Sequence, residues 1–393
     1  MNTRRLVTIA AAAVVVFTGV HCAPVDPPGS EEPPPLAPAP PAVSDTLPFP
    51  APGPASADPL QTRIDAAVRQ VKQRDLLTTN GFWTVFHGIL GLGPSVELLD
   101  PFTGKRCNAL DYIADARTPP IRGLRFLPTP DGLDVETQAG SFVGQGHQDQ
   151  FVAEMVEWNV SPDRVFMVNG KRHTFQEFIN ESRARASVKE KQELDWAVVI
   201  IGQSFPTDAE WTNRQGDKLH LADLLKKELG EPLDMAACGG THRLYGMTWV
   251  YHKHLSEGGK ADGVWKEVAD KITEYKRKAQ QMQNVDASFS TNFFRAPGNA
   301  PEIQLRINTT GHILEWLSLA GTDEELRQPW MRDAANTLAM MILDNENIAL
   351  EGGSVYHAVH GLLLYRFRVF GADGLGPMTP DLPPWPEQKG KAG

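Results

Sequence analysis

Two kinds of helical segment alternate along residues 61–375, and this alternation restricts the fold more than any other feature of the sequence. Six segments carry an apolar stripe at a spacing of three and four residues, with charged residues opposite, which is typical of helices with one face in water. Six others carry few charges, are rich in aromatic residues and mostly begin at a small residue, which is typical of helices buried on all sides. The amphipathic segments are 61–77, 108–116, 174–186, 218–229, 261–282 and 323–343, and the apolar segments are 81–92, 146–158, 191–205, 240–255, 310–320 and 354–370.

This regular succession predicts an all-α (α/α)6 toroid with small β-hairpin insertions. Repetition of one helical pair marks a repeat architecture, and twelve alternating helices close into two concentric rings, the inner one covered on both sides. An open α-solenoid is the alternative. We expect one hairpin at 124–136, where Asp131-Gly132 favours a turn, and a second around Asn169-Gly170.

The N-terminal residues predict export. Residues 1–5 contain two arginines and no acid, and residues 6–20 contain no charge. A basic start before an apolar core too short to span a membrane is typical of a secretory signal. Cys22 invites acylation as a lipoprotein, but His21 stands where the lipoprotein peptidase usually meets a small residue, so ordinary cleavage and an uncleaved anchor remain alternatives. All three place the protein in the periplasm or on the cell surface, in contact with a membrane only through its N-terminus.

The composition divides the chain into four parts. Residues 1–22 form the predicted signal, and residues 23–60 are dominated by Pro and Ala. Such a segment buries too little apolar surface to offset the entropy of ordering, so it acts as a disordered tether. Residues 61–375 form the toroid domain, and residues 376–393 form a Pro-rich tail.

Charge and cysteine content narrow the partners and cofactors. The net charge is −10 and the longest basic run is Lys276-Arg277-Lys278, which disfavours nucleic-acid binding. Cys107 and Cys238 could pair in an oxidising compartment or stay separate. The chain has no C-x-x-C pair, which excludes a cysteine zinc knuckle.

Three passages resemble the prenyltransferase and squalene-cyclase-like superfamily of α/α toroids. Residues 283–290 (QNVDASFS) are similar to the repeat in which Gln-Asn-x-Asp-Gly-x-Phe/Trp links an outer helix to the next inner one, with Ala287 in place of Gly. Residues 309–316 (TTGHILEW) and 238–244 (CGGTHRL) look like the starts of inner helices. Together the passages are also similar to a group of exported bacterial proteins without an assigned function.

The catalytic motifs of that superfamily are not present in this chain. It has neither the Asp-x-Asp-Asp acid of squalene-type cyclases nor the Asp-Asp-x-x-Asp of class I terpene synthases. Residues 355–358 (VYHA) are similar to the segment that supplies the zinc-binding histidine of protein prenyltransferases, but the matching Asp-x-Cys pair is missing and His312 stands in that region. The resemblance therefore implies the fold and leaves the reaction open.

Histidines at or near the starts of apolar helices are the strongest candidates for chemistry. They are His147, His242, His312 and His357, with His87 six residues after Gly81. In a toroid the starts of the inner helices meet at one mouth, where the positive helix ends favour neutral imidazole as a metal ligand or general base, and also favour anionic ligands. A divalent metal such as zinc, held by His242, His312 and His357, is one candidate cofactor. A purely structural role, with each ring bonded to the preceding loop, is the alternative.

Other residues near these helix starts complete the candidate site. A thiol at a helix start has a lowered pKa and can act as a nucleophile, and a carboxylate there can act as an acid or base, although a buried thiol and a helix cap are the structural alternatives. Aromatic residues one turn further on could line a central funnel or belong to the core. The catalytic candidates are His242, His312, His357, Cys238 and Glu351, and the ligand-binding candidates are His147, Asp149, Arg243, Tyr245, Trp316 and Tyr356.

The sequence predicts an envelope protein whose histidine-rich mouth binds a ligand, with or without catalysis. A small molecule, a glycan and an envelope protein are the candidate partners. The alternatives are a catalytically silent binding or scaffold toroid, and a glycan-active enzyme, the latter by analogy of fold alone.

Overall fold

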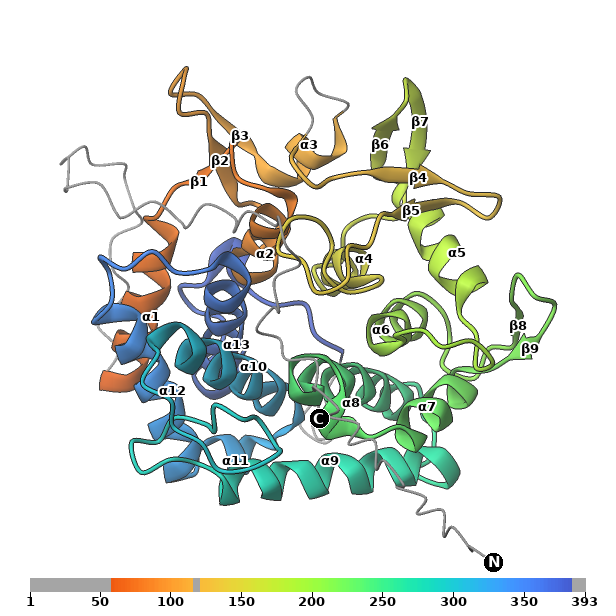
Figure 1. Ribbon diagram of the computed structural model, residues 1–393. Coiled ribbons are helices and arrows are strands. Elements are labelled where there is room, and N and C mark those ends of the chain that lie inside the picture. The colour runs from red at the N-terminus through yellow and green to blue at the C-terminus, as the bar shows by residue number, and fades with distance from the viewer. Residues whose placement is uncertain (1–57, 116–120, 384–393) are drawn as a thin grey trace, which may run out of the picture.

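The computed structural model describes residues 58–115 and 121–383, and within them the chain is mostly helical with four small sheets (Figure 1). The predicted signal, most of the predicted tether and the end of the tail lie outside the described residues. Among the described residues, no helix combines the length and the apolar composition needed to cross a bilayer.

The longer helices fall into the two predicted kinds. The mostly buried ones are α2 (Phe82–Leu92), α4 (Gln150–Glu157), α6 (Asp195–Ser204), α8 (Thr241–Ser256), α10 (Ile303–Ala320) and α13 (Gly352–Phe370). The others are α1 (Pro59–Lys72), α3 (Ala109–Ala114), α5 (Phe175–Arg185), α7 (Leu221–Gly230), α9 (Gly263–Gln281), α11 (Asp323–Leu326) and α12 (Pro329–Leu343).

The second group covers the first because each of its longer helices has one apolar face. In α9 the buried residues recur at a spacing of three and four, and charged residues fill the rest of the surface. In α2 every residue is buried. Such an all-apolar helix is stable only when neighbours surround it, so the two kinds of helix depend on each other.

The six buried helices follow one another in a succession of contacts. Each contacts the next along the chain, from α2 to α4, α6, α8, α10 and α13, and α13 in turn contacts α2. Helices α1, α5, α7, α9 and α12 contact the outer sides of these helices. The core therefore lies between the two sets and among the buried helices themselves.

Helices α10 and α13 approach each other closely at two glycines. A Cβ atom on Gly311 would lie 2.8 Å from the Cα atom of Ala358, and one on Gly361 would lie 2.9 Å from the backbone nitrogen of Glu315. Real Cβ atoms do not approach backbone this closely, so these positions require glycine. The contact places the middle of α10 directly against the middle of α13.

The strands form three two-stranded hairpins and one three-stranded sheet at the periphery, and the first seven strands lie in the upper part of Figure 1. The expected hairpins are confirmed as β4 (Phe126–Pro128) with β5 (Leu133–Val135), and β6 (Val165–Val168) with β7 (Lys171–Thr174). The sequence analysis missed β1 (Leu76–Leu77), β2 (Glu97–Leu99), β3 (Arg106–Asn108), β8 (Trp211–Thr212) and β9 (Lys218–Leu219). Strands this short carry too few residues to show an alternating pattern.

Several predicted helix boundaries were wrong, and the helices expected at 146–158 and 191–205 begin only at Gln150 and Asp195. The helix expected at 61–77 ends at Lys72, and its last two residues form β1. The helix expected at 323–343 is interrupted before Pro329, which begins α12 because proline lacks an N–H group and suits a first helical position. The helix expected at 310–320 begins at Ile303, because the polar residues before Thr310 are compatible with a helix that is only partly buried there.

Because α10 and α13 approach each other closely, a methyl group added at their contact should lower the stability of the fold, whereas one added elsewhere should not. We expect Gly361→Ala to lower the free energy of unfolding by about 1–3 kcal/mol, because backbone atoms of α10 occupy the space of the new Cβ. Gly230→Ala is the matched control, since no atom lies within 4 Å of its Cβ position. Urea unfolding of both variants tests the prediction, and equal midpoints would contradict it.

Candidate functional site

Five histidines from distant parts of the sequence gather among the buried helices, and we call them the histidine centre. They are His87 of α2, His147 just before α4, His242 of α8, His312 of α10 and His357 of α13. The ring centroids of His312 and His357 are 4.0 Å apart, and that of His87 lies 5.2 Å from that of His357. His242 lies 5.3 Å from His312 and 4.9 Å from His147. The structure thus brings all five predicted histidines together.

The histidines lie deeper in their helices than the sequence analysis expected. Only His242 occupies a first helical turn, while His87, His312 and His357 lie further inside their helices. His147 precedes its helix altogether. The expectation that helix starts create the environment of all these rings is therefore wrong, and burial in the core takes that role.

Hydrogen bonds fix the ring orientation of three of the histidines. Nδ1 of His87 donates to the carbonyl oxygen of Trp83 at 2.8 Å, and Nδ1 of His312 donates to that of Asn308 at the same distance. A carbonyl oxygen can only accept, so Nδ1 carries the hydrogen and Nε2 keeps a lone pair. Nδ1 of His357 likewise donates to Oε2 of Glu315 at 2.8 Å. These bonds leave a lone pair on Nε2 of each ring, and on His87 this atom lies 3.1 Å from the side-chain nitrogen of Gln150.

His242, His312 and His357 form a group with metal-binding geometry. One ligand atom from each lies within 4.8 Å of the other two, and all three residues are buried. Among the described residues, neither ring nitrogen of His242 has a hydrogen-bond partner. A second group joins His87, Glu154 and His357 within the same limit.

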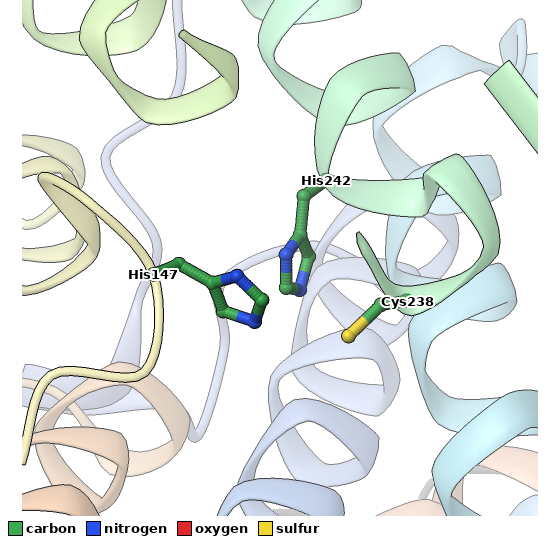
Figure 2. Close-up of side chains that lie close together, drawn as sticks. All are labelled: His147, Cys238 and His242. Atoms are coloured by element: carbon green, nitrogen blue, oxygen red, sulfur yellow. The ribbon is translucent and has the colours of Figure 1, made fainter. Parts of the chain in front are cut away.

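A third group consists of His147, Cys238 and His242, whose side chains point toward one another in Figure 2. Cys238 and Gly239 adopt positive φ values of 47° and 62°, so α8 begins only after them. The structure does not bond Cys238 to Cys107. Another interaction engages Cys238, so we leave its sulfur out of the ligand set.

Buried carboxylic acids lie beside the histidine centre. Glu315 follows His312 by one turn and bridges two histidines, because its other oxygen accepts from Nδ1 of His360 at 2.6 Å. Helix α4 contributes Glu154, whose oxygens make no hydrogen bond of normal geometry within the described part of the chain, and Glu157, which accepts from the hydroxyl of Tyr245 at 3.3 Å. The centre therefore combines imidazole and carboxylate donors.

Burial keeps most of the histidines neutral. Burial and the neighbouring histidines hold the pKa of His87 and of His242 well below the usual range, and they lower the pKa of His312 to about 3. His147 differs: burial opposes its charging, but the Glu193 carboxylate outweighs burial and raises its pKa. Neutral imidazole is the form that binds a metal ion.

Burial also separates the acids into two protonation states. Burial and the other carboxyl groups raise the pKa of Glu154 and of Glu157 well above the usual range, which favours the neutral acid. Burial acts in the same direction on Glu315, but His357 and His360 outweigh it and hold its pKa below the usual range. Glu315 is therefore the ionised acid of the centre.

Three charged residues from the sequence prediction are engaged in structural contacts. Asp149 is bound by Arg185 and accepts from the hydroxyl of Ser182 at 3.0 Å. Arg243 forms ion pairs with Asp195 and Glu228. Glu351 caps α13 by accepting from the backbone nitrogens of Gly353 and Ser354, which is the structural alternative considered for it.

The aromatic candidates also have structural contacts. The indole of Trp316 donates to Thr248 at 3.0 Å within the core, and Tyr245 bonds Glu157 beside the centre. Tyr356 is fully buried and packs against the position of Gly91. Tyr245 thus contacts a residue beside the histidine centre.

Sequence analysis missed Glu154, Glu157 and His360 as residues of this region. The signal was present, because a carboxylate in an otherwise apolar, fully buried helix is unusual and marks a special environment. His360 follows His357 by three residues, a spacing that places both on one helix face.

Comparison of the chain with protein-family models, with curated proteins and with solved structures finds no match.

The depressed pKa of His312 predicts a pH-dependent stability in the metal-free protein. The unfolded chain binds a proton at His312 below about pH 6.5, whereas the folded chain does so only near pH 3, so acidification between these values favours unfolding. We expect His312→Gln to flatten the loss of stability over that window by up to about 1.4 kcal/mol per pH unit. Leu314→Ala, a core variant without an ionisable group, should lower stability equally at every pH. Urea unfolding from pH 4 to 7 measures both slopes, and parallel curves for His312→Gln and the parent would contradict this.

Proposed function

We propose that this protein is an exported protein of the α/α-toroid type whose histidine centre binds a divalent transition-metal ion such as zinc. The observation that carries the proposal is the group of His242, His312 and His357, whose ligand nitrogens lie within 4.8 Å of one another. Zinc holds imidazole nitrogens at about 2.0–2.1 Å, so two such nitrogens in a tetrahedral site are about 3.4 Å apart. Small side-chain rotations therefore suffice to close the site around an ion.

The hydrogen bonds behind the rings support a metal ligand role. Metal-binding histidines usually donate their second ring nitrogen to a carboxylate or a backbone carbonyl, which fixes the tautomer. His357 has such a bond to Glu315, and His312 has one to the carbonyl of Asn308. His242 buries two nitrogens without a partner, which is costly, and coordination would satisfy one of them.

The toroid supports the site through its closure. A cycle of contacts that returns from α13 to α2 brings residues that are far apart in sequence to one place. Export is supported by the basic start at Arg4 and Arg5 and the uncharged run at 6–20.

Burial favours metal binding over turnover of a large substrate. The rings of His87, His242, His312 and His357 belong to residues that are at most 3 % exposed, and a glycan would need an open cleft beside them. Closed sites are typical of structural ions. Hydrolysis of a small molecule is the second candidate, since three histidine ligands leave a fourth position for water, as in catalytic zinc sites.

Metal binding by the full chain tests the proposal. We expect the chelator-treated protein to take up zinc stoichiometrically. We also expect His312→Gln and His357→Gln to weaken its tightest zinc binding by more than about 100-fold, because even the loss of an outer-shell partner costs about 10–100-fold. His173→Gln is the matched control, because His173 lies in β7 and bonds Glu177. Elemental analysis and competition with a chromophoric chelator measure uptake and affinity. A parent protein without stoichiometric zinc would contradict the proposal.

A further inference from the structure

Glu154 is a buried carboxyl group, and neither of its oxygens makes a hydrogen bond of normal geometry within the described residues. It lies in the middle of α4 and is fully buried. Its nearest basic atom is Nε2 of His87, 3.9 Å from Oε1, and His87 is fully buried as well. A buried carboxyl group without partners is costly, and proteins retain such groups mainly where they bind something.

The surroundings of Glu154 are rich in acids and poor in fixed positive charge. Glu157 and Glu315 are buried nearby and raise its pKa. Within the described residues, the ion pairs of Glu154 and Glu315 are with histidines alone, and none involves Lys or Arg. Ionisation of Glu154 therefore requires positive charge beside it, which a divalent cation would supply.

The donor atoms around Glu154 match a cation site. Ligand atoms of His87, Glu154 and His357 lie within 4.8 Å of one another. The side-chain amide of Gln150 lies beside them, with its nitrogen 3.1 Å from Nε2 of His87 and its oxygen without a partner. A half turn of that amide would present its oxygen to an ion. Mixed imidazole, carboxylate and amide donors suit a first-row transition metal.

We propose that the histidine centre holds a second divalent cation, bound by His87 and Glu154, beside the ion bound by His242, His312 and His357. This inference rests on the proposed function, since it extends the same centre. His357 belongs to both groups but has one free nitrogen, because its Nδ1 donates to Glu315, so it serves one ion at a time. The two sets of donors lie next to each other, with His357 between them. Two-metal sites have this arrangement, with ions about 3.5–4 Å apart.

The number of bound ions tests this inference. The full chain is stripped with a chelator and titrated with Co2+, and the bound metal is measured by elemental analysis after equilibrium dialysis. We expect two ions per chain in the parent and one in Glu154→Gln, which keeps the shape of the side chain and removes its charge. Glu210→Gln, whose carboxylate pairs with Lys218 at the surface, is the control and should retain two. His312→Gln should lose the other ion and retain one.

The outcomes separate the two proposals. A parent with one ion, unchanged in Glu154→Gln and lost in His312→Gln, overturns the second site and leaves the proposed function standing. A parent with no ion overturns the proposed function itself. Thermal unfolding followed by circular dichroism verifies that each variant is folded.

A second measurement needs no variant. Electron paramagnetic resonance of the parent loaded with two Co2+ ions should show magnetic coupling between them, because they share one centre. Two uncoupled ions would overturn the claim that the second site adjoins the first.

Discussion

The contact between α10 and α13 is the constraint on which the rest of the centre depends. Gly311 and Gly361 let the two backbones meet without an intervening side chain. This contact places Glu315 between His357 and His360 and brings the ring of His312 against that of His357. The other helices then add one donor each, from α2, α4 and α8, because the cycle of buried helices directs their inner faces to the same region.

The histidine centre lowers the stability of the folded state. Burying imidazoles and carboxyl groups costs free energy that well-packed apolar side chains would not cost. Glu315 offsets part of that cost through its two histidines, but Glu154 and His242 have no comparable partner. Groups that weaken the folded state in this way point to a binding role, since stability alone would favour their replacement.

The sequence predicted the helices well because their apolar patterns continue over many residues. The stripe at Trp265, Val268 and Ile272 repeats over many residues, and so does the uncharged run of α6. It predicted that histidines would converge, because a repeat of helical pairs brings equivalent positions together. It could not predict how deep each ring lies, because α10 begins with polar residues that resemble a linker. Nor could it assign partners to Glu351 or Arg243, since those depend on contacts between distant segments.

X-ray absorption at the zinc edge of the loaded full chain tests the central claim most directly. The account predicts a first shell of nitrogen and oxygen atoms at about 2.0–2.1 Å, with the outer-shell scattering that imidazole rings produce, because His242, His312 and His357 supply the ligands. A first shell dominated by sulfur at about 2.3 Å, or one without imidazole scattering, would contradict it.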